Sequence, residues 1–144
     1  MKRAHWAWGV LGILIFILAV WQIDQASDGL NITELPSENI PATRIYPDIL
    51  DIDSRPVVLI GHGFAGSGVI MRAFAFTLAH AGYDIVLWDY AGHGANPNPL
   101  RSAELLRDAE AALNALTSQR SITLERTAIL GHSMGSGVAL EFGT

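Results

Sequence analysis

Three short apolar runs after residue 55 limit the fold most strongly, because each leads directly into a loop rich in glycine and histidine. Apolar, β-branched runs of this length suit strands buried on both faces of a parallel sheet. We therefore predict strands, each followed by its loop, at residues 56–60 (loop 61–68), 85–88 (loop 89–95) and 127–130 (loop 131–137).

The segment after the first loop has the spacing of a helix over residues 69–81. Ser67 is placed to cap this helix and Gly82 to end it in a left-handed conformation. We expect its buried stripe to consist of the apolar residues at helical spacing: Ile70, Phe74, Leu78 and Ala81.

A second helix is predicted between the second and third strands, with Ser102 as its cap. Its apolar stripe is Leu105, Ala109, Ala112, Leu113 and Leu116. The polar residues expected to point away from that stripe are Arg107, Asp108, Glu110 and Asn114. Strands joined by crossover helices predict a right-handed, doubly wound α/β arrangement with a parallel sheet. In such sheets the ligand site lies beyond the carboxyl ends of the strands, where all three loops meet.

The third loop contains the pattern G-x-S-x-G as Gly131-His132-Ser133-Met134-Gly135. A serine hydroxyl is a weak nucleophile, and a sharp strand-to-helix turn can hold it away from the sheet beside a base. Strand and helix would approach closely at Gly131 and Gly135, where side chains would collide. The alternative interpretation is an ordinary glycine-rich turn.

The first loop can supply the complementary part of an acyl-transfer site. Backbone N–H groups aimed at a developing oxyanion stabilise the transition state, and one donor would be the N–H of Met134. The second would come from the His62-Gly63-Phe64 turn, and we assign it to the Phe64 N–H. Alternatively, Gly61 and Gly63 merely permit a tight turn.

The three loops together, GHGFAGSG, DYAGHGAN and GHSMGSG, resemble those of the α/β-hydrolase superfamily. The resemblance covers about residues 55–144 and is closest to the branch of monoacylglycerol lipases, lysophospholipases and serine aminopeptidase-like hydrolases. It implies that the three strands lie side by side in the order second, first, third. It also implies Ser133 as nucleophile, and Phe64 and Met134 as oxyanion donors. The residues it implies as support for the loops or floor of the site are His62, Gly63, Asp89, Gly92, His93, Gly94, Gly131, His132 and Gly135.

The resemblance also implies an acid and a histidine base that follow the serine in the chain. The family's triad runs in the order Ser, Asp or Glu, His, yet no histidine follows Ser133. We expect the acid and the base to lie beyond Thr144, so that the fold is truncated after the serine turn and this segment alone is inactive. A substitute base from His62, His93 or His132 is disfavoured, because none of them holds the family's position.

The N-terminal segment is the second apolar feature. Residues 6–23 carry no charge and as a helix would rise ~27 Å, close to the ~30 Å of a bilayer core. Trp6, Trp8 and Trp21 stand at its two ends, as is typical of membrane interfaces. The Lys2-Arg3 pair predicts a cytoplasmic N-terminus and an extracytoplasmic hydrolase domain, which is periplasmic in a Gram-negative cell. The alternatives are a cleaved signal peptide and a buried core helix.

Residues 24–54 are expected to be a tether interrupted by Pro36, Pro41 and Pro47. Within it, residues 42–46 and 49–52 could form short strands at a sheet edge. The predicted organisation is therefore an anchor (1–23), a tether (24–54) and the N-terminal part of an α/β-hydrolase domain (55–144).

Composition argues against several other kinds of site and partner. The chain has no cysteine and a net charge of −5, which argues against a thiolate metal site and a nucleic-acid partner. A metal site at Asp89 and the loop histidines is a weaker alternative, because no metal-ligand spacing is present. The predicted function is a membrane-anchored serine hydrolase that cleaves an ester, or less readily an amide, without a cofactor or metal. A membrane-tethered binding module without catalysis is the alternative.

Overall fold

The computed structural model describes residues 2–37, 40–48 and 55–143. Strands and α-helices follow one another in the chain as α1 (Lys2–Gln25), β1 (Leu30–Glu34), β2 (Ala42–Pro47), β3 (Val57–Gly61), α2 (Arg72–His80), β4 (Asp84–Trp88), α3 (Leu105–Thr117), β5 (Thr127–Gly131) and α4 (Met134–Phe142). Short 3₁₀ turns, η1 (Gly68–Met71), η2 (Ser102–Glu104) and η3 (Leu124–Arg126), precede α2, α3 and β5.

The strands form one sheet in the order β1-β2-β4-β3-β5. β4, β3 and β5 are parallel, and their order is the second-first-third arrangement that the resemblance implies. The sheet as a whole is mixed, because β1 and β2 add to it in antiparallel register. The prediction of a parallel sheet therefore holds for β3, β4 and β5 and is wrong for β1 and β2. β2 coincides with the strand considered over residues 42–46, whereas β1 was not predicted, and residues 49–52 lie outside the described residues.

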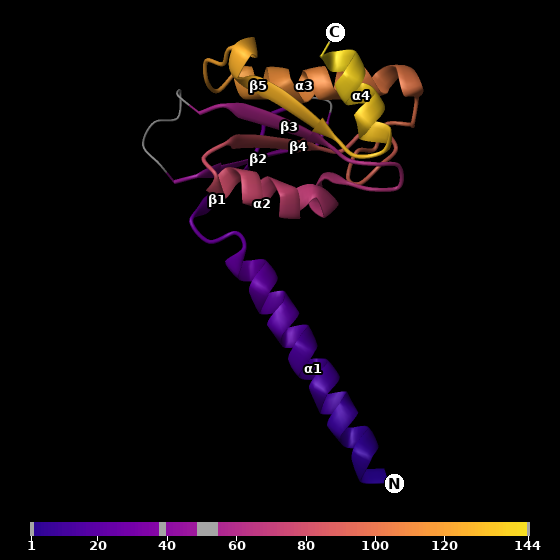
Figure 1. Cartoon of the computed structure of the whole chain (residues 1–144). Coiled ribbons are helices and arrows are strands. Elements are labelled where there is room, and N and C mark those ends of the chain that lie inside the picture. Colours follow the sequence, from indigo (N-terminus) through magenta and orange to yellow (C-terminus); the bar gives the residue numbers. More distant parts are fainter. Residues whose placement is uncertain (1, 38–39, 49–54, 144) are drawn as a thin grey trace.

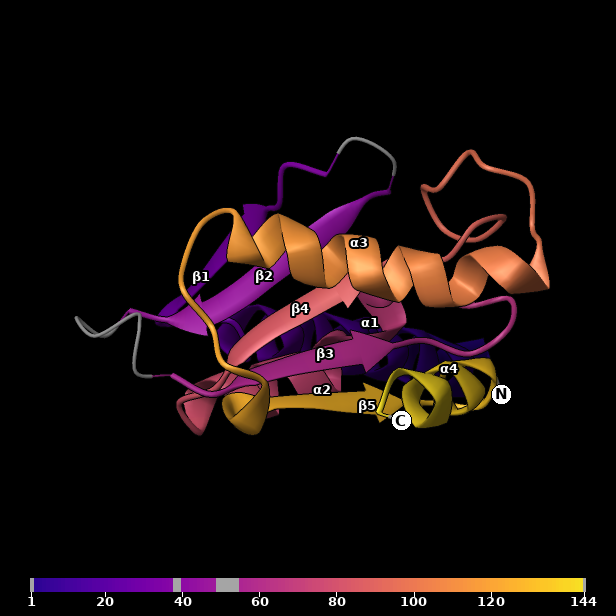
Figure 2. The ribbon, with the colours of Figure 1, turned by 90° about the horizontal axis from the view of Figure 1, so that it is seen from above.

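Helices cover both faces of the sheet. α2 lies on one face, while α3 and α4 lie on the other (Figures 1 and 2). Two hydrophobic clusters fill these layers, one between the sheet and α3 and α4, the other between the sheet and α2. β3 and β4 are buried along their whole length, as their uninterrupted apolar runs predict.

The buried face of α2 differs from the predicted one. Ile70 and Phe74 are 59% and 55% exposed and Ala81 is exposed as well, so these three members of the predicted stripe are wrong; Leu78 packs against the core as predicted. The residues that face the sheet from η1 and α2 are Met71, Ala75, Phe76 and Ala79. Ser67 precedes η1 without a side-chain capping hydrogen bond, and Ser102 is the first residue of η2, whose N-cap is Arg101. Gly82 has the expected left-handed φ of 96°.

The predicted stripe of α3 is confirmed, with Ala109, Ala112 and Leu116 fully buried. Asp108, however, does not face solvent as predicted. Its carboxylate is buried and accepts a hydrogen bond from the Ala91 N–H at 2.7 Å. Burial raises the pKa of Asp108 and outweighs the lowering effect of that hydrogen bond. Asp108 thereby fixes the start of the loop after β4.

A buried ionic cluster ties the sheet together at the end away from the glycine loops. Asp84, at the start of β4, is paired with Arg44 at 2.6 Å and with Arg120 at 2.7 Å. Arg120 also donates to the Arg55 carbonyl at 3.0 Å. All three charged side chains are buried. The hydrogen bonds and opposite charges of the partners therefore replace the water that each side chain has lost.

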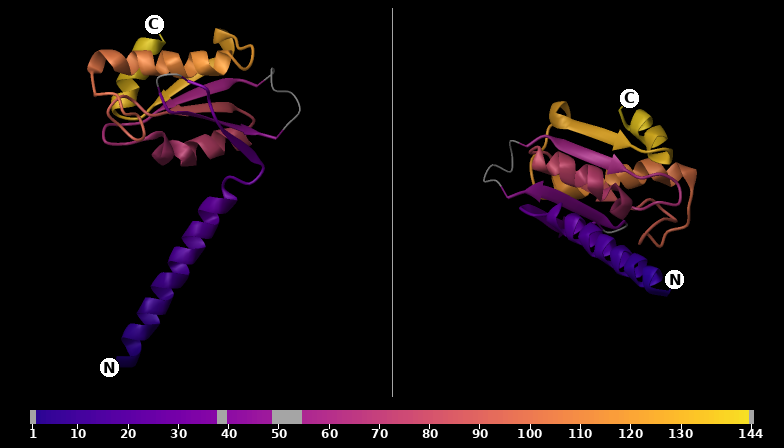
Figure 3. Two further views of the ribbon diagram at one scale, coloured as in Figure 1. Left: turned by 180° about the vertical axis from the view of Figure 1, so that it is seen from behind. Right: turned by 60° about the horizontal axis from the view of Figure 1, so that its bottom comes forward.

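α1 projects from the sheet on the side of α2 (Figures 1 and 3). Every side chain from residue 6 to residue 22 is exposed, so the structure does not support a core helix. Among the described residues, no helix combines the length and the apolarity needed to cross a bilayer.

Candidate active site

Ser133 lies at a sharp turn between β5 and α4. Its backbone has φ 53° and ψ −112°, a conformation that L-residues rarely adopt and that costs about 1–3 kcal/mol when the surroundings enforce it. Its side chain is exposed, not packed in the core. The turn therefore presents the hydroxyl outward at the carboxyl end of the parallel strands.

Two glycines permit this turn, as the sequence predicts. A Cβ at Gly131 would overlap the Gly135 carbonyl, and a Cβ at Gly135 would lie 2.5 Å from the Gly61 carbonyl oxygen. The hydroxyl of Ser136 donates to the Gly131 carbonyl at 2.8 Å and closes the turn. Strand and helix can approach this closely only without side chains at Gly131 and Gly135.

The first loop lies directly against the serine turn. A Cβ at Gly63 would lie 2.8 Å from His132 Nδ1 and 3.2 Å from Ser133 Cβ. The His132 N–H donates to the Gly61 carbonyl at 3.0 Å and holds the two loops in register. The residue after Gly63 is Phe64, whose ring is 70% exposed.

The two predicted oxyanion donors flank this contact. Met134 is the first residue of α4, where a helix N-terminus favours negative charge. Within the described part of the chain, no backbone carbonyl accepts a hydrogen bond from the Phe64 N–H. The arrangement can therefore aim two backbone donors at an oxygen next to Ser133.

His62 has a structural position that excludes it as a base. Its Nε2 accepts a hydrogen bond from the Tyr90 N–H at 3.1 Å, so its proton must be on Nδ1, which donates to the Gly63 carbonyl at 2.8 Å. Burial lowers the pKa of His62, more than its hydrogen bond to Gly63 raises it. A neutral His62 thus connects the first loop to the second.

Asp89 connects the same two loops through its side chain, by hydrogen bonds that the sequence analysis did not specify. The carboxylate accepts from the Gly68 N–H at 2.6 Å and from the Ala95 N–H at 2.7 Å. A Cβ at Gly94 would overlap that carboxylate. In the sequence, the short separation between Asp89 and Gly94 could have indicated this contact. Asp89 therefore supports the floor of the site, as the resemblance implied for this loop.

His93 completes the floor. It is buried, its Nδ1 lies 3.0 Å from the Ala91 carbonyl, and its ring packs at 5.3 Å from that of Phe64. Among the described residues, the Ser133 hydroxyl makes no hydrogen bond to a side chain, and no group of three metal-ligating side chains is present. The loop histidines are thus brought to the same edge as Ser133, but His62 and His93 are engaged with backbone groups.

The model of the family described as "Serine aminopeptidase, S33" matches residues 52–144. The chain belongs to this α/β-hydrolase family. An uncharacterized protein of Mycobacterium tuberculosis is 36% identical to this family member over 87 residues, which are 60% of this chain and 31% of the relative. A putative non-heme chloroperoxidase of Synechocystis is 33% identical over 100 residues, which are 69% of this chain and 34% of the relative.

Solved structures show the same fold. An esterase of Pyrococcus furiosus superposes with a TM-score of 0.61 at 21% identity, over 82% of this chain and 48% of that one. An epoxide hydrolase of an endophytic Streptomyces superposes with a TM-score of 0.58 at 22% identity, over 81% of this chain and 33% of that one. This S33 chain spans about a third to a half of the length of these relatives.

Proposed function

We propose that this chain contributes the nucleophile and the oxyanion donors of a serine hydrolase that cleaves esters and, less readily, amides. The observation that carries the proposal is the contact between the Gly63 backbone and the strained, exposed Ser133. In the proposed arrangement, one substrate carbonyl group would lie between the serine hydroxyl and the N–H groups of Phe64 and Met134.

In the proposed reaction, Ser133 Oγ attacks the carbonyl carbon of the substrate, and its proton passes to a histidine base. The carbonyl oxygen takes up the negative charge and accepts hydrogen bonds from Phe64 and Met134. Collapse of the tetrahedral intermediate breaks the ester bond, and the alcohol leaves with the proton from the histidine. Water then attacks the acyl-serine with the same base, releasing the acid and restoring the hydroxyl. No cofactor or metal takes part.

The base and its acid partner are proposed to come from a part of the protein outside this sequence. Support comes from two of the three loop histidines, His62 and His93, whose Nδ1 atoms lie against backbone carbonyls. It also comes from the absence of a described side-chain partner for Ser133 Oγ. Without a triad base, only the residual catalysis of the oxyanion hole and substrate binding is expected. Residues 1–144 by themselves should therefore hydrolyse activated esters barely faster than a Ser133→Ala variant does.

Labelling with a fluorophosphonate probe tests the proposal in the full-length protein. The wild-type protein should be labelled and the Ser133→Ala variant should not, because the probe requires an activated serine. Ser118→Ala is the matched control, since Ser118 lies at the end of α3 and its hydroxyl donates to the Ala115 carbonyl at 2.7 Å. Unlabelled wild-type protein would favour a binding module without catalysis.

We also propose that α1 holds the protein at a membrane, with the hydrolase domain on the extracytoplasmic side. The proposal draws on the uncharged, exposed side chains of residues 6–22, on the tryptophans near both ends and on the Lys2-Arg3 pair. The protein should stay with the membrane fraction after carbonate extraction, and deletion of residues 1–23 should release it. Release of the intact protein by carbonate would contradict the anchor. Protease added outside the cytoplasm should digest the domain; protection of the domain there would contradict the orientation.

A further inference from the structure

The start of α2 and the segment before it expose several apolar side chains to solvent. Val69, Ile70 and Phe74 are 60%, 59% and 55% exposed, and Phe64 in the preceding loop is 70% exposed. Ala73, between them, is exposed as well. We call these five residues the outer α2 patch. A surface helix ordinarily presents polar side chains on its exposed side.

The patch differs from the other exposed apolar side chains of the domain. Those found among the described residues lie on four separate elements, namely β1, the loop before α3, η3 and α4: Ile32, Leu100, Leu124 and Leu140. Single exposed apolar residues are normal on a protein surface, whereas a contiguous cluster indicates a contact surface. The patch is therefore a stronger candidate for a contact surface than these four separate side chains are.

Charge around the patch favours a lipid partner. The chain has 14 acidic residues, but none lies between Asp53 and Asp84, the stretch that contains the patch. The ionisable residues of α2 are Arg72 and His80. The Asp89 carboxylate lies at the edge of the patch, where it accepts a hydrogen bond from the Gly68 N–H. A basic side chain such as Arg72 among apolar ones is attracted to anionic lipid headgroups.

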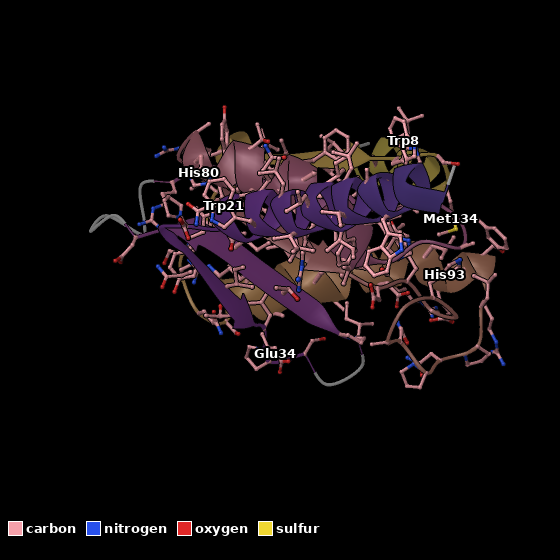
Figure 4. All side chains as sticks on the ribbon, turned by 90° about the horizontal axis from the view of Figure 1, so that it is seen from below. Trp8, Trp21, Glu34, His80, His93 and Met134 are labelled. Atoms are coloured by element: carbon pink, nitrogen blue, oxygen red, sulfur yellow. The ribbon has the colours of Figure 1, made fainter. Side chains whose placement is uncertain are left out.

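The position of the patch relative to α1 points to the same partner. α2 lies on the side of the sheet from which α1 projects (Figure 1). In the view from below, α1 lies in front of the sheet, with Trp21 toward the domain and Trp8 toward its far end (Figure 4), and Figure 1 shows that α1 leads away from the domain. His80 Nε2 lies 3.0 Å from the Ala26 carbonyl and so connects the end of α2 to the turn after α1. A bilayer that holds α1 would lie below this face.

We propose that the outer α2 patch is a lipid-contact surface that lies against the bilayer holding α1. The inference rests on the proposed membrane attachment and extends it from α1 to the domain. Phe64 belongs to the loop that carries a predicted oxyanion donor, so the contact would bring the entrance of the Ser133 site to the lipid boundary.

Single-cysteine labelling tests this contact, because residues 1–144 contain no cysteine; any cysteine elsewhere in the full-length protein is first replaced by serine. Ile70→Cys and Phe74→Cys variants of the full-length protein are labelled with an environment-sensitive nitrobenzoxadiazole dye. Vesicles of phosphatidylcholine and phosphatidylglycerol are then added, with and without a spin-labelled quencher lipid. Leu124→Cys, 76% exposed on η3, is the matched control, and Ile15→Cys on α1 reports attachment. All four positions are exposed, so the core is unchanged.

The expected result is a blue shift and quenching of the dyes at positions 70 and 74 by the vesicles, with no change at 124. Quenching at 15 without quenching at 70 and 74 would overturn the patch and leave the anchor intact. Absence of quenching at all three would overturn both. Before vesicles are added, emission of the dyes at 70 and 74 at a shorter wavelength than that of the dye at 124 would also overturn the inference. If that difference depends on protein concentration, a second copy of the protein covers the patch. If it does not, another part of the same protein covers it.

Discussion

Gly135 is the position where the geometry of the serine turn can be tested most sharply. A Cβ at Gly135 would lie 2.5 Å from the Gly61 carbonyl oxygen and 2.8 Å from its carbon. Ordinary contacts begin near 3.4 Å, so α4 and β3 would have to separate by about 0.9 Å. Because both obstacles are backbone atoms, no side chain can rotate away. Gly135→Ala should therefore lower the free energy of unfolding by about 2–3 kcal/mol, as overpacked cores do.

Gly137, two residues further along α4, provides a matched control. A Cβ there meets nothing within 4 Å, so Gly137→Ala should raise the free energy of unfolding by about 0.5–1 kcal/mol through helix propensity. Urea unfolding followed by circular dichroism measures both variants under the same conditions. Equal effects of the two substitutions, or a loss below about 0.5 kcal/mol for Gly135→Ala, would refute the close approach of strand and helix.

Three further predictions concern stability. Burial lowers the pKa of His62 below its ordinary 6.5. As pH falls, the unfolded state therefore binds a proton before the folded state does, and the free energy of unfolding should fall below about pH 6.5. His62→Gln should reduce this dependence of the free energy of unfolding on pH, measured by urea unfolding at several pH values. Asp84→Asn leaves Arg44 and Arg120 buried without their shared carboxylate and should cost about 3–5 kcal/mol in urea unfolding. Ser133→Gly relieves the strain at φ 53° and should raise the free energy of unfolding by about 1 kcal/mol.

Each of these predictions has a result that would contradict it. An unchanged pH slope in His62→Gln would mean that another group controls acid stability. For the buried ion cluster, the control is Glu104→Gln. The exposed ion pair of Glu104 with Arg107 should contribute less than about 1 kcal/mol to the free energy of unfolding. Similar losses of that free energy in Asp84→Asn and Glu104→Gln would contradict the burial of the Asp84 cluster. A loss of stability in Ser133→Gly would show that the serine turn is unstrained.

The parallel strands and the serine turn could be predicted because their signals are local. An uninterrupted apolar run such as residues 57–60 suits only a buried strand, and Gly131 and Gly135 mark a close approach by their spacing around Ser133. The juxtaposition of the first and third loops followed from strand order, which the family resemblance supplied.

Other features depend on tertiary contacts that periodicity does not contain. α2 has apolar residues on both sides, so the pattern could not decide whether Phe74 or Phe76 faces the sheet. Asp108 is charged and was expected at the surface, but the nearby Ala91 N–H offers a buried donor. β1 is half-exposed at the sheet edge, where strand patterning is weak.

The structure of the full-length protein with a fluorophosphonate bound to Ser133 tests the central claim most directly. The account predicts a covalent bond to Ser133 Oγ, with the phosphonyl oxygen about 2.7–3.1 Å from the N–H groups of both Phe64 and Met134. A phosphonyl oxygen turned away from both groups, or an adduct on any other residue, would contradict it.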